Sequence, residues 1–336
     1  MKIIIPMAGR GTRLRPHTLT VPKPLIQVAG KPMVHRIVED IVKVCNTKID
    51  EIAYVIGADF GVEVEKQLVE IAEKLGAKGI IKYQNEKLGT AHAILCAKES
   101  LKGNVVVAFA DTLFKADFKL NPNNEGIIWV QNVENPEAFG VVKRNEQGEI
   151  IAFIEKPKVF VSNAAMIGIY YFKDGDYLRS ELQYLLDNEI KDKGGEYQLT
   201  VALENMRAKG MKFTTDTVTE WLDCGNKEAT IYTNQRYLSF IQNEKLVADS
   251  AIINNSVIIP PVFIGENVKI TNAVVGPFVS LGNNSSVENS VISNTIIQEN
   301  SFIKQANIKD SMIGNYANYE GNSQNLNIGD YSQIQA

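Results

Sequence analysis

Up to about residue 245, short apolar runs alternate with longer stretches in which apolar side chains recur every three or four positions. The short runs predict strands, and the longer stretches predict helices. The early strands are apolar throughout and each precedes a helix, which is typical of a mostly parallel sheet covered on both faces. The later strands follow one another more closely and indicate an antiparallel insertion. Strands are predicted over 3–6, 52–56, 79–84, 105–110, 126–130, 140–143, 150–154 and 165–172, and helices over 33–44, 62–75, 90–101, 177–189, 199–209 and 227–243.

After about residue 246 the pattern changes to short β-branched runs broken by Asn, Ser and Gly. Aliphatic side chains recur every six positions, and several are followed directly by glycine. This is the signature of hexapeptide β-helices, in which each hexad forms one side of a coil and its aliphatic side chain points inward. A conventional antiparallel domain would need a period of two, which this segment does not sustain. The six-residue spacing links Ile258, Ile264 and Ile270, then Val275, Leu281 and Val287, and then Val291, Ile297 and Ile303.

We therefore predict an α/β chain of two domains. Residues 1–245 would form a Rossmann-like mixed, mostly parallel sheet with helices on both faces, and residues 246–336 a left-handed parallel β-helix with three hexads per coil. At 336 residues, with 45% hydrophobic and 22% charged side chains, the chain is long enough for more than one buried core.

Composition narrows the setting further. The first apolar run is only three isoleucines long, and no later run approaches about 18 residues, so we expect neither a signal peptide nor a membrane span and place the protein in the cytoplasm. The three cysteines, Cys45, Cys96 and Cys224, lie far apart without metal-ligand spacing. They predict buried thiols rather than a disulfide framework or a zinc site.

Charge is distributed unevenly. The formal net charge is −4, yet the chain up to Val38 carries seven lysines and arginines and no Asp or Glu. This segment includes a glycine-rich loop over 8–13, directly after the first predicted strand. Its glycines allow backbone N–H groups to approach an anion, and Arg13 and Lys23 follow closely. A dinucleotide motif would need a third glycine where Leu14 stands, and the lysine of a P-loop is absent, so the predicted ligand is a polyphosphate bound in another way.

The stretch PMAGRGTRLRPHTLTVPKPL at 6–25 resembles the signature of the sugar nucleotidyltransferases, or nucleotide-sugar pyrophosphorylases. Members of this family join a nucleoside triphosphate to a sugar 1-phosphate and release pyrophosphate. Residues 1–245 would then be the catalytic domain. Further matches are GKPM at 30–33, LGTAHA at 88–93, Asp111, EKP at 155–157, GEYQLT at 195–200 and WLD at 221–223.

The resemblance implies a role for each matching residue. The reaction brings two polyanions together, so positioning, cations and a metal supply the catalysis and no protein nucleophile is required. Arg13 would stabilise the departing β- and γ-phosphates and Lys23 would lie beside the α-phosphate. Asp111, the third implied catalytic residue, would share Mg²⁺ with Asp223, since magnesium takes one or two carboxylates plus phosphate oxygens. The implied nucleotide-binding residues are Ala8, Gly9, Gly11, Thr12, Arg13, Gln84, Gly89 and Thr90. The implied sugar-phosphate-binding residues are Gly140, Glu155, Lys156, Gly168 and Glu196.

Within these sets, Gln84 resembles the glutamine that reads a pyrimidine, because an amide offers both a donor and acceptors to an imide edge. Lys156 resembles the lysine that holds the sugar phosphate, and Glu196 the acceptor for sugar hydroxyls. The favoured reaction joins dTTP or UTP to glucose 1-phosphate. A mannose-1-phosphate guanylyltransferase and a catalytically silent regulatory subunit remain alternatives, although the complete residue set argues against the second.

The predicted β-helix carries no expected chemistry of its own, because acyl transfer on such domains usually needs a histidine and none follows His92. We expect it to assemble a homo-oligomer, since its faces would otherwise leave aromatic side chains exposed. Removing it should leave nucleotidyl transfer intact, because every implied site residue precedes residue 226. Neither nucleic acid nor membrane is an expected partner. The aromatic side chains in question are Phe278, Phe302, Tyr316 and Tyr319.

Overall fold

The computed structural model describes residues 1–9, 11–192, 194–321 and 326–335. Its contacts divide the chain into two compact units. Unit 1 comprises Met1–Gly9 and Ile37–Trp221, and unit 2 comprises Arg10–Arg36 and Leu222–Ala336. Unit 2 therefore groups the cationic segment with the C-terminal strands, while the domain boundary near residue 245 stays a prediction.

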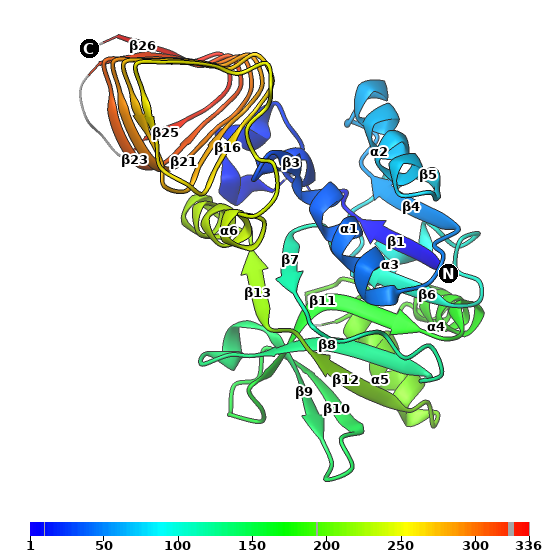
Figure 1. Cartoon of the computed structure of the whole chain (residues 1–336). Helices are drawn as coiled ribbons and strands as arrows, with labels where there is room; N and C mark the ends of the chain where they lie inside the picture. Colours follow the sequence, from blue (N-terminus) through cyan, green and yellow to red (C-terminus); the bar gives the residue numbers. More distant parts are fainter. Residues whose placement is uncertain (10, 193, 322–325, 336) are drawn as a thin grey trace. The chain divides into compact units, whose positions relative to one another are not determined.

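Unit 1 is built on a nine-stranded mixed sheet with the order β10-β9-β11-β6-β1-β4-β5, and β8 joins β11 while β12 joins β8 (Figure 1). Strands β5, β4, β1 and β6 run parallel, and β11 turns the sheet antiparallel at β6. This confirms the Rossmann-like sheet and its antiparallel extension. The strands are β1 Lys2–Pro6, β4 Glu51–Ile56, β5 Lys78–Tyr83, β6 Val105–Ala108, β8 Gly126–Asn132, β9 Gly140–Arg144, β10 Ile150–Glu155, β11 Ala164–Phe172 and β12 Phe213–Thr217; the short strands β7 and β13 span Thr112–Lys115 and Glu220–Asp223.

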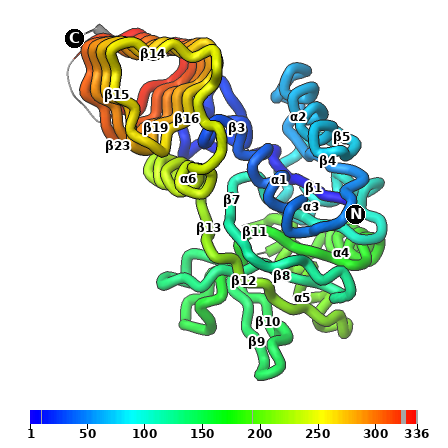
Figure 2. Tube along the Cα trace, in the orientation of Figure 1, coloured from blue at the N-terminus to red at the C-terminus, as the bar shows by residue number. Residues whose placement is uncertain are grey.

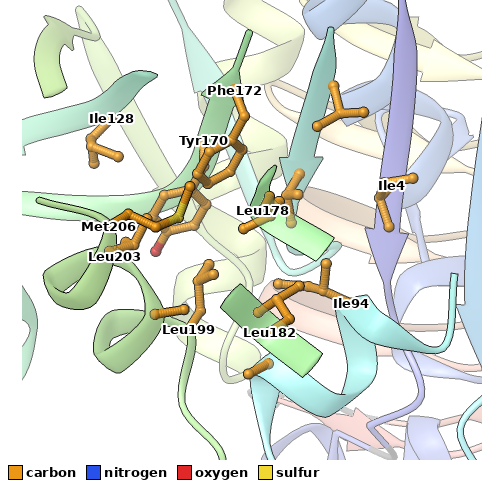
Figure 3. Close-up of a cluster of buried hydrophobic side chains, with 14 of the residues drawn as sticks. Ile4, Ile94, Ile128, Tyr170, Phe172, Leu178, Leu182, Leu199, Leu203 and Met206 are labelled. Carbon is orange, nitrogen blue, oxygen red and sulfur yellow. The ribbon is translucent and has the colours of Figure 1, made fainter. Parts of the chain in front are cut away.

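Helices cover both faces of this sheet. On one face α3, α4 and α5 bury a large apolar cluster against the strands, in which Ile94 and Leu182 pack with Ile4 (Figure 3). On the opposite face α2 lies so close to β5 that a Cβ added to Gly79 would come 2.7 Å from the Cα of Val69. The helices are α1 Met33–Cys45, α2 Val62–Lys74, α3 Thr90–Leu95, α4 Gly175–Asp187, α5 Leu199–Ala208 and, in unit 2, α6 Lys227–Phe240.

Helix α3 ends six residues before the predicted end at 101. Beyond Leu95 the backbone tightens into turns, in which the N–H of Ala97 bonds the carbonyl of Ile94 at 3.0 Å and that of Ser100 bonds Ala97 at 2.8 Å. Leu101 is nevertheless fully buried, so the apolar pattern continues past the helix and made the prediction too long.

The C-terminal part of unit 2 is a parallel β-helix (Figure 2). Its strands stack coil on coil, as predicted, and the aliphatic residues that precede glycine point inward: Ile264, Leu281 and Ile313 are fully buried. The strands are β14 Ile252–Asn254, β15 Val257–Ile258, β16 Val262–Ile264, β17 Lys269–Thr271, β18 Val274–Val275, β19 Val279–Leu281, β20 Ser286–Glu288, β21 Val291–Ile297, β22 Phe302–Lys304, β23 Asn307–Ile313, β24 Asn318–Glu320, β25 Asn327–Ile328 and β26 Gln333–Gln335.

The coils are shorter than three hexads. Ile264 pairs with Leu281, Leu281 with Ile297, Ile297 with Ile313 and Ile313 with Ile328, so the repeat shortens from 17 to 16 and then 15 residues. The coils are therefore one to three residues shorter than 18, and the expectation of three full hexads per coil was wrong.

The shortened coils change which side chains point inward. Val291 was predicted to be internal, but it is 48% exposed, and its neighbour Ile292 is fully buried in the column of Val275. Conversely, Tyr319 was predicted to be external, yet it is 2% exposed and continues the inner column of Ile303. The homo-oligomer expected from the exposed aromatic row stays a prediction.

Asparagine holds the corners of the β-helix. Asn255, Asn272 and Asn289 all have φ between 46° and 51°, a left-handed conformation that asparagine tolerates better than most residues. Their side chains form a ladder along the helix, with N···O distances of 2.7 and 3.2 Å. The Asn-rich breaks seen in the sequence are these corners.

Unit 2 also holds the cationic segment, which folds into three single-turn 3₁₀ helices and a small hairpin. Among the described residues, no helix of either unit is long and apolar enough to cross a membrane. The elements of the segment are η1 Thr12–Leu14, η2 His17–Leu19, η3 Lys23–Leu25, β2 Gln27–Val28 and β3 Lys31–Pro32, and a further 3₁₀ turn in unit 1, η4, spans Pro136–Ala138.

Candidate active site

The carboxyl ends of the parallel strands form the edge where the candidate site lies. The chain runs from β1 to β4 and β5 on one side and then returns to β6 on the other side of β1, so the edge at β1 and β6 is a topological switch point, where open α/β sheets bind ligands. Ala8 and Gly9 follow the end of β1, Gln84 follows β5, and Asp111 lies three residues beyond β6. The fold thus brings residues from three separate sequence regions to one sheet edge.

The side chain of Gln84 has a defined orientation. Its Nε2 lies 3.3 Å from the carbonyl oxygen of Gly89 and 3.2 Å from Nδ1 of His92. A carbonyl oxygen can only accept, so the amide NH₂ must face Gly89 and the Oε1 atom is left to accept from a ligand. His92 had no role in the sequence-based prediction, although it lies three residues after Gly89, on the first turn of α3.

The turn before α3 requires glycine. Gly89 has φ 110° and ψ 179°, a conformation that is nearly restricted to glycine. An added Cβ would lie 2.5 Å from the backbone oxygen of Tyr197. The backbones bond on both sides of this contact, with Tyr197 N–H donating to Leu88 at 2.8 Å and Ala91 N–H donating to Tyr197 at 2.9 Å.

The same contact joins two of the predicted motifs, LGTAHA and GEYQLT. The hydroxyl of Thr90 donates to Oε1 of Gln198 at 2.9 Å and accepts from the backbone N–H of Leu199 at 2.9 Å. Gln198 also donates to Glu196 Oε2 at 2.8 Å, and Glu196 is exposed. The Thr90 hydroxyl therefore serves the fold, and a nucleotide role for this residue would fall to its backbone.

The implied sugar-phosphate residues cluster on β9 and β10. Gly140 and Glu155 lie opposite each other in this antiparallel pair, and a Cβ on Gly140 would come 2.9 Å from Oε2 of Glu155 and 2.6 Å from Cε of Met166. Lys156 follows with φ 44°, and its backbone N–H bonds the carbonyl of Phe139 at 3.1 Å. The backbone is thus fixed while the Lys156 side chain is exposed.

Gly168 interrupts β11 at the same end of the sheet. Its φ is 86°, and the pairing of β11 with β8 shifts register between Met166 and Tyr170. The Gly168 carbonyl accepts from the N–H of Phe109 at 3.0 Å, which ties the bulge to the strand that leads to Asp111. Burial, with a smaller contribution from the Glu155 carboxylate, raises the pKa of Tyr170, so this phenol stays protonated.

In unit 2, Gly11 and Lys23 are packed against each other. Gly11 has φ 64°, and a Cβ there would lie 2.6 Å from the Cβ of Lys23, a residue that is 7% exposed. The Gly11 carbonyl accepts from the N–H of Leu14 at 3.0 Å and from the hydroxyl of Thr18 at 2.8 Å. Thr12 and Arg13, by contrast, are exposed. The cationic segment therefore combines a buried lysine, Lys23, with an exposed arginine, Arg13, that a ligand can reach.

Asp223 ends β13 with an exposed side chain, while its carbonyl accepts from Thr233 Oγ1 at 2.8 Å. Asp111 belongs to unit 1 and Asp223 to unit 2. Across the described ranges, no three His, Cys, Asp or Glu side chains gather as a ready-made metal site. The donor chemistry fits a hard cation such as Mg²⁺ that is held by one or two carboxylates and completed by phosphate oxygens and water.

Comparison with known proteins gives the class. A family profile described as "Nucleotidyl transferase" matches residues 2–239. The chain belongs to the nucleotidyl transferase family, which confirms the resemblance to sugar nucleotidyltransferases.

Individual relatives differ in their names. The chain is 31% identical over 271 residues to the bifunctional protein GlmU of Methanococcus maripaludis, in a match that covers 78% of this chain and 62% of GlmU. It is 32% identical over 282 residues to the mannose-1-phosphate guanylyltransferase catalytic subunit beta of Drosophila melanogaster, covering 80% and 72%. A crystal structure from Bacillus anthracis that carries the name glucose-1-phosphate thymidylyltransferase aligns with a TM-score of 0.58 at 24% identity, over 69% of this chain and 93% of that one; it supports the fold alone.

Proposed function

We propose that this protein joins a nucleoside triphosphate to a hexose 1-phosphate and releases pyrophosphate. The observation that carries the proposal is that Ala8 and Gly9, where the glycine-rich, cationic stretch of the sequence begins, follow β1 at the topological switch point of the sheet, in a chain of the nucleotidyl transferase family. Loop N–H groups and nearby cations are the means by which proteins hold a triphosphate.

In the proposed reaction a sugar-phosphate oxygen attacks the α-phosphorus in line and pyrophosphate leaves on the opposite side. Lys23 neutralises charge at the α-phosphate, and Arg13 stabilises the charge that grows on the leaving pyrophosphate. Lys156 holds the sugar phosphate on its exposed ammonium group. The Mg²⁺ that Asp111 and Asp223 would hold supplies further neutralisation of phosphate charge when bound.

The orientation of Gln84 narrows the base. Its Oε1 is an acceptor, so the preferred base presents an N–H there, as thymine and uracil do with N3–H and guanine does with N1–H. Adenine and cytosine present a ring-nitrogen acceptor at the corresponding edge and would face oxygen with a lone pair. We therefore favour dTTP or UTP with glucose 1-phosphate, and GTP with mannose 1-phosphate is the second candidate because a relative carries that name.

Steady-state assays test the proposal. The purified chain is incubated with Mg²⁺ and each of dTTP, UTP, GTP, ATP and CTP, paired in turn with glucose 1-phosphate and mannose 1-phosphate, while pyrophosphate release is followed. We expect dTTP or UTP with glucose 1-phosphate to give the highest kcat/KM, and ATP and CTP the lowest. Triphosphate binding without pyrophosphate release from any pair would identify a silent regulatory subunit instead.

A further inference from the structure

The cationic segment lies against the last coils of the β-helix, both in unit 2 (Figure 1). Nε2 of His17 lies 2.8 Å from Oδ1 of Asn327, and the hydroxyl of Thr20 donates to the carboxylate of Asp330. Each of these pairs joins residues 310 positions apart. The amide oxygen of Asn327 can only accept, so His17 donates from Nε2. Burial lowers the pKa of His17, which favours its neutral form.

The cationic segment and the last coil are also in close steric contact. A Cβ added to Gly329 would lie 2.8 Å from the Cβ of Pro16, so the coil needs glycine at this contact. His17 is 3% exposed. Two coils earlier, Gln298 donates to the backbone carbonyl of Gln27 at 3.2 Å. The segment is therefore bonded to more than one coil along this side of the β-helix.

This corner has a hydrogen bond that recurs between coils, and the segment adds a donor to its last acceptor. A side-chain oxygen in each coil accepts from a backbone N–H of the coil before it: Asn315 Oδ1 from Glu299 N–H at 3.0 Å, and Asp330 Oδ1 from Asn315 N–H at 2.7 Å. Asp330 lies in the last coil of this corner, and its other carboxylate oxygen accepts from Thr20. Thr20 thus adds a second donor to the carboxylate of Asp330, beside the backbone N–H of Asn315.

Residues 11–26 of the segment are held by short local turns. Its backbone bonds are single turns, such as Leu14 to Gly11, Leu19 to Pro16 and Ile26 to Lys23. Isolated 3₁₀ turns have poor hydrogen-bond geometry and are marginal by themselves. Binding sites for phosphate need their groups held to within about 0.5 Å, which requires support from outside the turn.

We propose that the last coils of the β-helix position the triphosphate loop, with Asn327 and Asp330 as the positioning residues. They fix His17 and Thr20, and these flank Thr18, whose hydroxyl holds the carbonyl of Gly11. The inference rests on the proposed function, since it assumes that this loop binds the triphosphate. It replaces the expectation that the β-helix can be removed without loss of nucleotidyl transfer.

The test compares Asn327→Ala and Asp330→Ala with Asn327→Asp and Asp330→Asn, which keep an acceptor oxygen. Asn255→Ala, in the first coil of the β-helix, is the matched control. We expect each alanine variant to raise the triphosphate KM or lower kcat. For Asn327→Ala, kcat/KM for the triphosphate should fall about tenfold, the cost of leaving the buried donor of His17 unpaired. For Asp330→Ala the fall should be smaller, because Thr20 is exposed to water. The KM for sugar 1-phosphate should be unchanged, the acceptor variants should recover most of the loss, and the control should match wild type.

Hydrogen–deuterium exchange of peptides covering residues 11–26 gives a second readout that needs no activity. Exchange there should accelerate in the two alanine variants and not in the control. Wild-type triphosphate kinetics in every variant, or a lowered Tm with unchanged KM and kcat, would overturn the positioning role. If wild type releases no pyrophosphate with any substrate pair, the proposed function fails, while unchanged exchange in the variants would separately refute the contact.

Discussion

Replacing Gly89 with alanine should destabilise unit 1 severely and by two separable causes. The conformation at φ 110° and ψ 179° costs a residue with a Cβ about 1–3 kcal/mol. The new Cβ would also lie 2.5 Å from the backbone oxygen and 2.8 Å from the backbone nitrogen of Tyr197. Backbone cannot swing away as a long side chain can, so the two hydrogen bonds that flank the contact must lengthen or break, at about 1 kcal/mol each. The expected loss is about 3–5 kcal/mol.

Urea unfolding followed by tryptophan fluorescence measures this loss. Both tryptophans, Trp129 and Trp221, lie in unit 1, so the signal reports the unit that contains Gly89. With a urea m-value of about 3 kcal/mol/M, the midpoint of Gly89→Ala should fall by about 1–1.7 M. Gly148→Ala is the matched control, because Gly148 has φ 81° and a Cβ there would meet nothing within 4 Å.

The control isolates the cost of the dihedral angle from the cost of the clash. Gly148→Ala should lose about 1–2 kcal/mol, or roughly 0.3–0.6 M in midpoint. Equal shifts for the two variants would show that the turn relaxes around the new methyl group, and the argument from the Tyr197 contact would be refuted. A smaller shift for Gly89 than for Gly148 would refute the dihedral argument as well.

Three further predictions concern the proposed chemistry. Asp111→Asn and Asp223→Asn should each leave folding intact and cut turnover by about a hundredfold or more, because a hard cation loses a charged ligand. EDTA should abolish wild-type turnover until Mg²⁺ is restored, and full activity in EDTA would contradict the metal requirement. Lys156→Ala should mainly raise the KM for sugar 1-phosphate, whereas Arg13→Ala should mainly lower kcat. Equal changes of both parameters in both variants would refute the assignment of Lys156 to the sugar phosphate and of Arg13 to the leaving pyrophosphate. Gln84→Glu keeps an acceptor oxygen but loses the amide donors to the carbonyl of Gly89, and it should raise the KM for the preferred triphosphate while leaving the KM for sugar 1-phosphate as in wild type; an unchanged triphosphate KM would place the base elsewhere.

The sequence predicted the apolar elements of unit 1 well, because buried parallel strands need continuous apolar runs. It missed β12, whose sequence FTTDT reads as polar. This strand is defined by its parallel pairing with β8, a long-range contact that no local pattern encodes. Asp216 lies within it opposite Trp129, and burial raises the pKa of this carboxyl group. A single acidic residue in a half-buried strand was enough to hide the element.

For the candidate site, motif spacing identified the residues but not their neighbours. Gln84 could be selected from its place after a strand, whereas the orientation of its amide depends on His92 and the Gly89 carbonyl. Thr90 shows the opposite case, because its motif position suggested a ligand contact and its hydroxyl bonds Gln198 and Leu199. Side-chain partners across 108 residues are set by packing, which the sequence alone does not display.

The same limit explains the expectation that the β-helix would be dispensable. That argument rested on the position of the implied site residues, which all precede residue 226. It did not consider that residues far away in the sequence can hold the loop in position. A stack of coils ends in unpaired backbone groups and needs a cap, and a loop of single turns needs a platform. The contacts of Pro16 with Gly329 and of Thr20 with Asp330 supply support of this kind for the loop. Deleting the β-helix would therefore remove the contacts that hold the loop in position. The single-residue variants at Asn327 and Asp330 are the sharper test, because they leave the coils in place.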